Sequence, residues 1–109
     1  MITRLWHGWT RPEDADAYET LLKTEIFPGI IAKGIAGLLG IELLRRETDD
    51  ETEFVVVMRF TDVDSVRAMT GGDPEQAYVP DVARKVLKRF EPRARHFETR
   101  VTETLSKPT

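Results

Sequence analysis

His7 is the side chain in this sequence best suited to chemistry. The run Leu5-Trp6-His7-Gly8-Trp9 alternates in a way typical of a β-strand, and the alternation places His7 on the same face as Leu5 and Trp9. An imidazole titrates near neutral pH, so His7 could take a proton from an acidic phenol or stabilise the resulting oxyanion. A buried histidine bonded to a backbone carbonyl, or one stacked at a subunit contact, would produce the same pattern. Trp6 points to the opposite face, where we expect it in the core.

Three other side chains could contact a ligand. Trp9 could stack against a planar molecule or lie at the rim of its site. Tyr78 could reach a pocket, although a position at the edge of the core with its hydroxyl in water is favoured. His96 alternates away from Phe97 and Val101. If those two pack under the helices, His96 points towards a pocket or a subunit contact, and we favour the subunit contact.

Composition excludes several other kinds of site. The chain has no cysteine, which excludes disulfides, zinc–thiolate sites, iron–sulfur clusters and a cysteine nucleophile. Its two histidines are far apart and no compact acidic triad accompanies them, so we expect no metal. The net charge of −3 is unsuited to general nucleic-acid binding, which depends on neutralising phosphates.

The chain is expected to form one domain with no membrane partner. Its 109 residues suit a single domain over 1–104, followed by a short flexible tail over 105–109. The most apolar stretch, 26–40, is too short and too interrupted by Pro28, Lys33 and glycines to span a bilayer. The N-terminal residues lack the features of a signal peptide, so we expect a cytoplasmic protein.

A strand–helix–strand–strand order positions these side chains. The strand over 2–9 leads into the capping box Thr10–Glu13, which begins a helix that ends near Pro28-Gly29. Strands over 41–48 and 53–60 follow, joined by a polar turn. The residues 27–40 are predicted to form a loop or irregular helical turn.

The second half of the chain adds a helical region and a last strand. Asp62 caps a short helix that stops at Gly71-Gly72. Asp73 caps a third helix, which restarts at Pro80 and continues through Phe90. The last strand runs over 93–103. The order is β-α-β-β-α-β, the ferredoxin-like α+β arrangement, in which an antiparallel sheet carries its helices on one face.

One face of such a sheet remains uncovered. A chain of 109 residues cannot cover both faces, so the second face must line a pocket, pair with another copy of the chain, or do both. We therefore expect a homodimer with two-fold symmetry.

Five segments together resemble the antibiotic biosynthesis monooxygenase family. They are Ile2–Thr10, Ala15–Tyr18, Gly37–Ile41, Phe54–Phe60 and Asp62–Ser65, and the resemblance extends over roughly 1–102. It implies a dimeric α+β barrel in which two sheets face each other, with one pocket per subunit between sheet and helices. Members include cofactor-free monooxygenases of polycyclic aromatic molecules, haem-degrading enzymes and proteins of no known activity, so the fold alone does not fix the function.

The resemblance disfavours haem degradation. That branch has an asparagine on the first strand, a tryptophan in the second helix and an axial histidine in the third. The corresponding positions hold Leu5, Met69 and a residue near Val79. Cofactor-free oxidation has weaker requirements, since a deprotonated, electron-rich substrate reacts with O2 itself in a dry pocket.

The resemblance and the strand pattern lead to one functional expectation. The protein would be a cofactor-independent monooxygenase of a small, aromatic or polyketide-like molecule, with O2 as co-substrate and no metal or organic cofactor. The alternative is a non-catalytic small-molecule-binding or regulatory dimer of the same fold. Trp9, His7 and Arg45 are loose counterparts of the family's functional residues. His7 is the expected catalytic residue, and the expected substrate contacts are Leu5, Trp9, Arg45, Met69, Tyr78 and His96.

Overall fold

Strand β1 (Ile2–Thr10) lies at the centre of the fold. The computed structural model describes residues 1–106. β1 pairs antiparallel along its whole length with β3 (Thr52–Phe60), and β3 pairs on its other side with β2 (Leu38–Glu47). Two short strands, β4 (Arg89–Phe90) and β5 (Arg95–Glu98), share the remaining edge of β1. The order β2-β3-β1-β4, with β5 beside β4 along β1, is that of a ferredoxin-like sheet whose last strand is divided.

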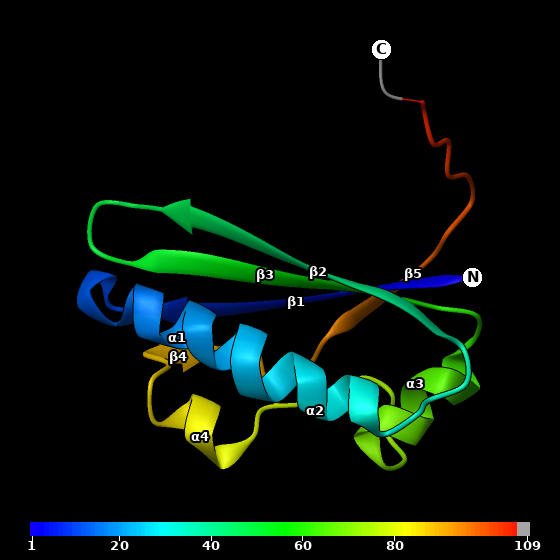
Figure 1. Cartoon of the computed structure of the whole chain (residues 1–109), viewed down its shortest axis with the longest axis horizontal. Coiled ribbons are helices and arrows are strands. Elements are labelled where there is room, and N and C mark those ends of the chain that lie inside the picture. The colour runs from blue at the N-terminus through cyan, green and yellow to red at the C-terminus, as the bar shows by residue number, and fades with distance from the viewer. Residues whose placement is uncertain (107–109) are drawn as a thin grey trace.

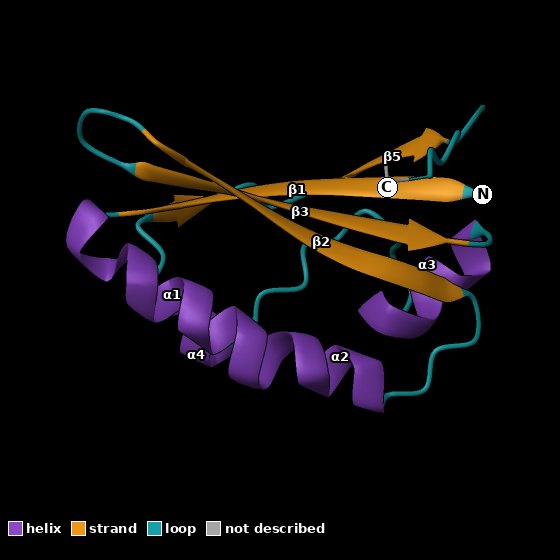
Figure 2. Ribbon diagram, turned by 45° about the horizontal axis from the view of Figure 1, so that its top comes forward, coloured by secondary structure: helices purple, strands orange, loops and turns teal. Residues whose placement is uncertain are grey.

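All the helices lie on one face of this sheet (Figures 1 and 2). Along the chain, a long helical segment connects β1 to β2 and packs across the sheet, and two shorter helices follow β3. The expected α+β class, with an antiparallel sheet covered on one side, is confirmed. The long segment comprises a 3-10 turn (Pro12–Asp14), α1 (Ala15–Leu21), a π-helical turn (Leu22–Ile26) and α2 (Phe27–Ala32); the shorter helices are α3 (Val63–Thr70) and α4 (Asp81–Arg84).

The core lies between the helices and the face of the sheet that carries Trp6. The register places Trp6 opposite Val56, so both side chains point towards the helices. Tyr18 of α1 packs on Phe54 of β3 with ring centroids 4.9 Å apart in an edge-to-face arrangement, a favourable geometry for two aromatic rings. The strands β1 and β3 alternate between buried and half-buried residues because one face is covered and the other is not.

The first helical segment is longer than predicted and starts differently. It does not end at Pro28 but continues to Ala32, because the π-helical turn directly precedes the proline. There the Phe27 amide donates to the Leu22 carbonyl five residues back, and this wider turn accommodates a residue that has no amide hydrogen. The predicted capping box is absent: Thr10 is fully buried at the end of β1, and its hydroxyl makes no hydrogen bond within residues 1–106.

The region after α3 contains less helix than predicted. Asp62 caps α3 by accepting a hydrogen bond from the Ser65 amide at 2.9 Å, and Gly71 ends it in the left-handed conformation, as expected. Beyond it, as far as residue 106, only Asp81–Arg84 is α-helical. The chain then turns to satisfy the free edge of β1, where the amides of Lys88 and Glu91 donate to the carbonyls of Trp9 and His7.

The last strand is also shorter than predicted. Of the predicted strand over 93–103 only β5 forms, and 99–106 has no regular structure, while β4 lies in the stretch predicted to end the preceding helix. The predicted flexible tail begins at 105, and its residues 107–109 lie outside the described part of the chain. Within residues 1–106, none of the helices has the length and apolar character needed to cross a membrane.

Gly37 holds the entry to β2 against α3. Its φ is +100°, and a Cβ there would overlap the hydroxyls of Ser65 and Thr61, whereas Gly34 has a φ of +64° and open space around it. Both glycines adopt a backbone conformation that side chains disfavour, but only Gly37 also lies against other atoms.

We therefore expect Gly37→Ala to destabilise the fold more than Gly34→Ala does. Gly34→Ala should lower the free energy of unfolding by about 1 kcal/mol, and Gly37→Ala by roughly 3 kcal/mol, since overlap adds to the backbone penalty. Urea unfolding of both variants measures the difference. Equal losses would show that the Gly37 contact relaxes without cost.

Candidate functional site

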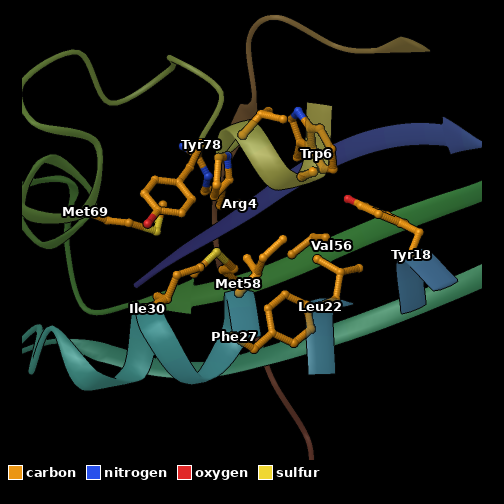
Figure 3. Close-up of a pocket in the computed structure, with 14 residues that line it drawn as sticks. Arg4, Trp6, Tyr18, Leu22, Phe27, Ile30, Val56, Met58, Met69 and Tyr78 are labelled. Carbon is orange, nitrogen blue, oxygen red and sulfur yellow. The ribbon is translucent and has the colours of Figure 1, made fainter. Parts of the chain in front are cut away.

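A cavity lies between the helices and the covered face of the sheet (Figure 3). Its walls come from β1, β3, the long helical segment, α3 and the chain around α4. Most of the lining side chains are buried, and the exceptions Phe27, Tyr78 and Pro80 mark the side on which it meets solvent. The lining residues are Arg4, Trp6, Tyr18, Leu22, Ile26, Phe27, Ile30, Val56, Met58, Met69, Tyr78, Val79, Pro80 and Ala83.

The cavity is narrow. It contains about 480 Å³ of space, its mouth included, of which about 40 Å³ is open to the centre of a water molecule. By the second measure it has room for roughly three waters. Two of its walls carry the flexible side chains Met58 and Met69, which adapt to a ligand more readily than branched side chains do. The cavity therefore suits a small ligand that displaces these methionines slightly.

Arg4 is the one charged residue among the described lining residues. It is 2% exposed, and its side chain lies between the rings of Tyr78 and Trp6 (Figure 3). Its Nη1 donates to the Pro74 carbonyl at 2.6 Å, and its Nη2 donates to the Gln76 carbonyl at 2.9 Å. Burial lowers the pKa of Arg4 to about 10, because removal from water disfavours the charged form.

His96 is the cross-strand neighbour of Arg4 and contacts its guanidinium. β5 pairs with β1 so that His96 is opposite Arg4, and His96 Nε2 lies 3.0 Å from Arg4 Nη1. Since an arginine can only donate, His96 accepts with a neutral ring. Burial, followed by repulsion from Arg4, lowers the pKa of His96, and Glu75 acts weakly in the opposite direction. His96 thus supports the arginine and does not line the cavity.

Two tyrosines also bring hydroxyl groups to the cavity, whereas the Nε1–H of the lining residue Trp6 already donates to the Glu91 carbonyl. Tyr18 is 1% exposed, its hydroxyl points towards the cavity (Figure 3), and it makes no hydrogen bond within residues 1–106. Burial raises the pKa of Tyr18, so its hydroxyl stays protonated and can donate to a ligand. Tyr78 is half-buried, with Lys33 Nζ 4.5 Å from the centroid of its ring.

The structure divides the residues expected at the site. Met69 and Tyr78 line the cavity. Leu5, His7 and Trp9 do not, because the helices cover the face of β1 that carries Arg4 and Trp6. The expectation that His7 and Trp9 border the pocket between sheet and helices is therefore corrected: both side chains lie on the uncovered face.

His7 belongs to a polar cluster on that uncovered face. Its Nδ1 lies 2.9 Å from an oxygen of Glu53, which lies opposite Trp9 on β3. The other oxygen of Glu53 pairs with Arg46 of β2. The contacts with His7 and Arg46 lower the pKa of Glu53. Trp9 lies next to this cluster, under the guanidinium of Arg89, whose central carbon is 3.8 Å from the ring centroid.

Arg45 lies at the edge of the sheet and away from the cavity. It pairs with Asp16 at 2.8 Å, with Glu19 at 3.1 Å and with Glu47 at 2.7 Å, so it fastens β2 to α1. These three carboxylates raise the pKa of Arg45 and satisfy its charge. A role for Arg45 in the cavity would require these contacts to break.

Sequence reasoning missed Arg4 and Tyr18 as site residues. The strand alternation does place Arg4 on the face of Trp6, and a charged residue on the covered face of a strand is an unusual feature that marks a special environment. Tyr18 carried no comparable signal, since its spacing fits an ordinary core position. Within residues 1–106, no group of three or more His, Asp or Glu side chains is placed to hold a metal ion.

Comparison with solved structures identifies the fold. A crystal structure from Bacillus cereus, named "putative antibiotic biosynthesis monooxygenase", matches this chain with a TM-score of 0.68 and 12% sequence identity, over 98% of each chain. At this identity the match establishes a shared fold, which is the fold implied by the sequence resemblance. No protein-family model matches the sequence, and a search of curated proteins finds no match.

The pairing of His96 with Arg4 predicts how stability depends on pH. The folded state lowers the pKa of His96 below its ordinary value of 6.5, so the unfolded chain binds a proton more readily. This stabilisation is complete above the unfolded pKa and is lost as the pH falls through the folded pKa.

We expect His96→Gln to reduce the loss of melting temperature between about pH 7.5 and about pH 5.5. The glutamine oxygen can still accept from Arg4 but does not titrate. Melting curves of wild type and variant across this range measure the effect, and His7 is common to both proteins. Parallel curves would show that His96 titrates alike in the folded and unfolded chain.

Proposed function

We propose that this protein binds a small aromatic molecule in the cavity between sheet and helices and oxidises it with O2, without a metal or organic cofactor. The observation that supports this most directly is the cavity itself, a buried apolar site with few polar atoms. The fold, shared with a structure named as a monooxygenase, supports the choice of reaction.

The dimensions of the cavity favour a ligand of one or two rings. Its free space is narrow, and the rings of Trp6, Phe27 and Tyr78 offer flat surfaces to a planar molecule. A larger polycyclic ligand would have to displace Met58 and Met69 considerably. We therefore place small phenols and quinols ahead of tricyclic molecules.

The proposed reaction needs no reductant other than the substrate. The ring carbon para to the phenolate oxygen exchanges its C–H for C=O, so that the phenol becomes a quinone: one atom of O2 bonds to that carbon, and the other leaves as water with the ring hydrogen and the hydroxyl proton. The protein would contribute a dry cavity and the Tyr18 hydroxyl as a donor to the oxyanion. His7 has no place in this scheme, because it lies on the other face of the sheet.

A non-catalytic binding dimer is the second candidate. None of the described lining residues is an Asp, Glu, His or Lys, so the cavity offers no ordinary general base. A substrate would have to enter as an anion or lose its proton readily inside. A binding or regulatory protein needs no such group.

We also propose that two copies pair through their uncovered faces. Leu44 and Phe97 are 48% and 51% exposed there, and Leu5, Val55 and Val57 lie between them and the cluster around His7. The face carries both acidic and basic residues beside these apolar ones, so it can meet its own copy across a two-fold axis with opposite charges facing.

A larger side chain at Ala83 tests whether the cavity binds the ligand. Ala83 lines the cavity and is 2% exposed, whereas its neighbour Val82 is 48% exposed. We expect small phenols and quinols to raise the melting temperature of wild type and of Val82→Leu. Ala83→Leu should weaken their binding by about tenfold or more, because the added methyl groups occupy the cavity.

The same ligands distinguish the two functions in an oxygen electrode. Oxygen uptake that falls in Ala83→Leu and persists in Val82→Leu supports oxidation in the cavity. Binding without oxygen uptake, with the ligand recovered unchanged, supports the non-catalytic dimer. Equal binding by both variants would contradict a ligand site in this cavity.

Sedimentation tests the pairing of the uncovered faces. We expect wild type to be a dimer and Val57→Lys to be a monomer, since a lysine at the centre of the interface would lose its hydration. Val82→Lys is the matched control on the helical side and should remain dimeric. A monomeric wild type, or a dimeric Val57→Lys, would exclude this arrangement.

A further inference from the structure

Arg4 is a buried cation without a counter-ion. Its hydrogen bonds go to two backbone carbonyls and to the neutral ring of His96, and it takes part in no ion pair within residues 1–106. Glu75, the carboxylate that acts on His96, is 55% exposed and pairs with Arg93 instead. Burial of a charge is strongly unfavourable unless an opposite charge or enough hydrogen bonds compensate for it.

The guanidinium still has donors to offer. It carries five N–H groups, and three of them are used by Pro74, Gln76 and His96. The Nε–H and the second N–H of Nη2 have no partner in the described chain. Because Arg4 lines the cavity beside Tyr78 (Figure 3), a ligand in the cavity would lie next to its side chain.

The surrounding residues hold the arginine in place. The carbonyls of Pro74 and Gln76 come from the segment between α3 and α4, and His96 comes from β5, so two separate parts of the chain fix the guanidinium. Its position is set before a ligand arrives, which lowers the cost of binding one. Lys33, against the outer ring face of Tyr78, adds a second positive charge on this side of the cavity.

We propose that the ligand of the cavity is a small planar organic anion, a carboxylate or a phenolate, whose charged oxygen pairs with Arg4. The inference rests on the proposed function, because it specifies the ligand of the same cavity. An anion would supply the missing counter-ion and accept from the unused N–H groups, with its ring against the apolar walls of the cavity. A ligand that binds as an anion also needs no general base in the cavity wall, and the described lining residues supply none.

Benzoate and benzamide test the inference, because they have nearly the same shape and differ in charge. We expect the wild-type protein to bind benzoate about ten- to a hundredfold more tightly than benzamide by calorimetry, the range expected of hydrogen bonds to a charged group. Arg4→Met should abolish that preference. Arg67→Met removes an exposed arginine of α3 and should keep it.

A phenol separates the two sources of the anion. 4-Nitrophenol changes colour on ionisation, so its spectrum reports the charge of the bound form. If the cavity takes phenolates, wild type should bind the coloured anion at a pH where the free phenol is mostly neutral, and Arg4→Met should not. Preference for benzoate without this colour change assigns the site to carboxylates alone.

A measurement on the wild-type protein tests the inference even if the Arg4→Met variant does not fold. An anion beside Arg4 offsets the repulsion between Arg4 and protonated His96, so benzoate should raise the midpoint of the His96 titration in NMR spectra. The resonances of His7, which lies on the other face of the sheet, serve as the internal reference.

The outcomes distinguish this inference from the function on which it rests. Equal or tighter binding of benzamide, or benzoate binding that leaves the His96 titration unchanged, overturns the anion and leaves the cavity as a ligand site. A benzoate preference lost equally in Arg67→Met shows an effect of overall charge and overturns the role of Arg4. Failure of both probes and of all phenols to bind overturns the anion and the proposed function together.

Discussion

The two-residue period of β1 governs the distribution of chemistry in this protein. Nine consecutive pairs join β1 to β3, so no bulge changes the face to which either strand directs its side chains. Arg4 and Trp6 are thereby committed to the helical side, and His7 and Trp9 to the other. The protein has two chemically different surfaces as a result, a narrow cavity and a broad uncovered face, and no side chain of β1 can serve both.

The cavity wall combines an apolar lining with a fixed positive charge. Apolar residues exclude water and so strengthen any electrostatic interaction inside, while backbone carbonyls and a neutral histidine keep Arg4 in position. Replacing this arginine by an apolar residue of similar size would remove the cost of burying its charge. Its presence in the wall is therefore easier to explain by what enters the cavity than by what holds the fold together.

The sequence predicted those features that depend on local chemistry. Asp62 and Gly71 bound α3 because a side-chain acceptor and a left-handed residue act within a few positions of the chain. Local patterns failed at the first helical segment, where the capping box at Thr10 does not form and a π-helical turn carries the helix past Pro28. Distant contacts decide the last strand, which divides because the edge of β1 takes its partners from two places. The site followed the same rule. Alternation separated His7 from Trp6 and placed Trp6 in the core correctly, but which side of the sheet holds the cavity depends on how the helices pack in the whole fold.

The outer strand of the sheet has consequences for assembly. β2 is an edge strand, and its register shifts between Leu38 and Gly40, while Arg45 and Arg46 near its other end are held by carboxylates of neighbouring elements. A shifted register and fixed charges make an edge a poor template for adding a further strand. Growth into fibrils along this edge is thus disfavoured.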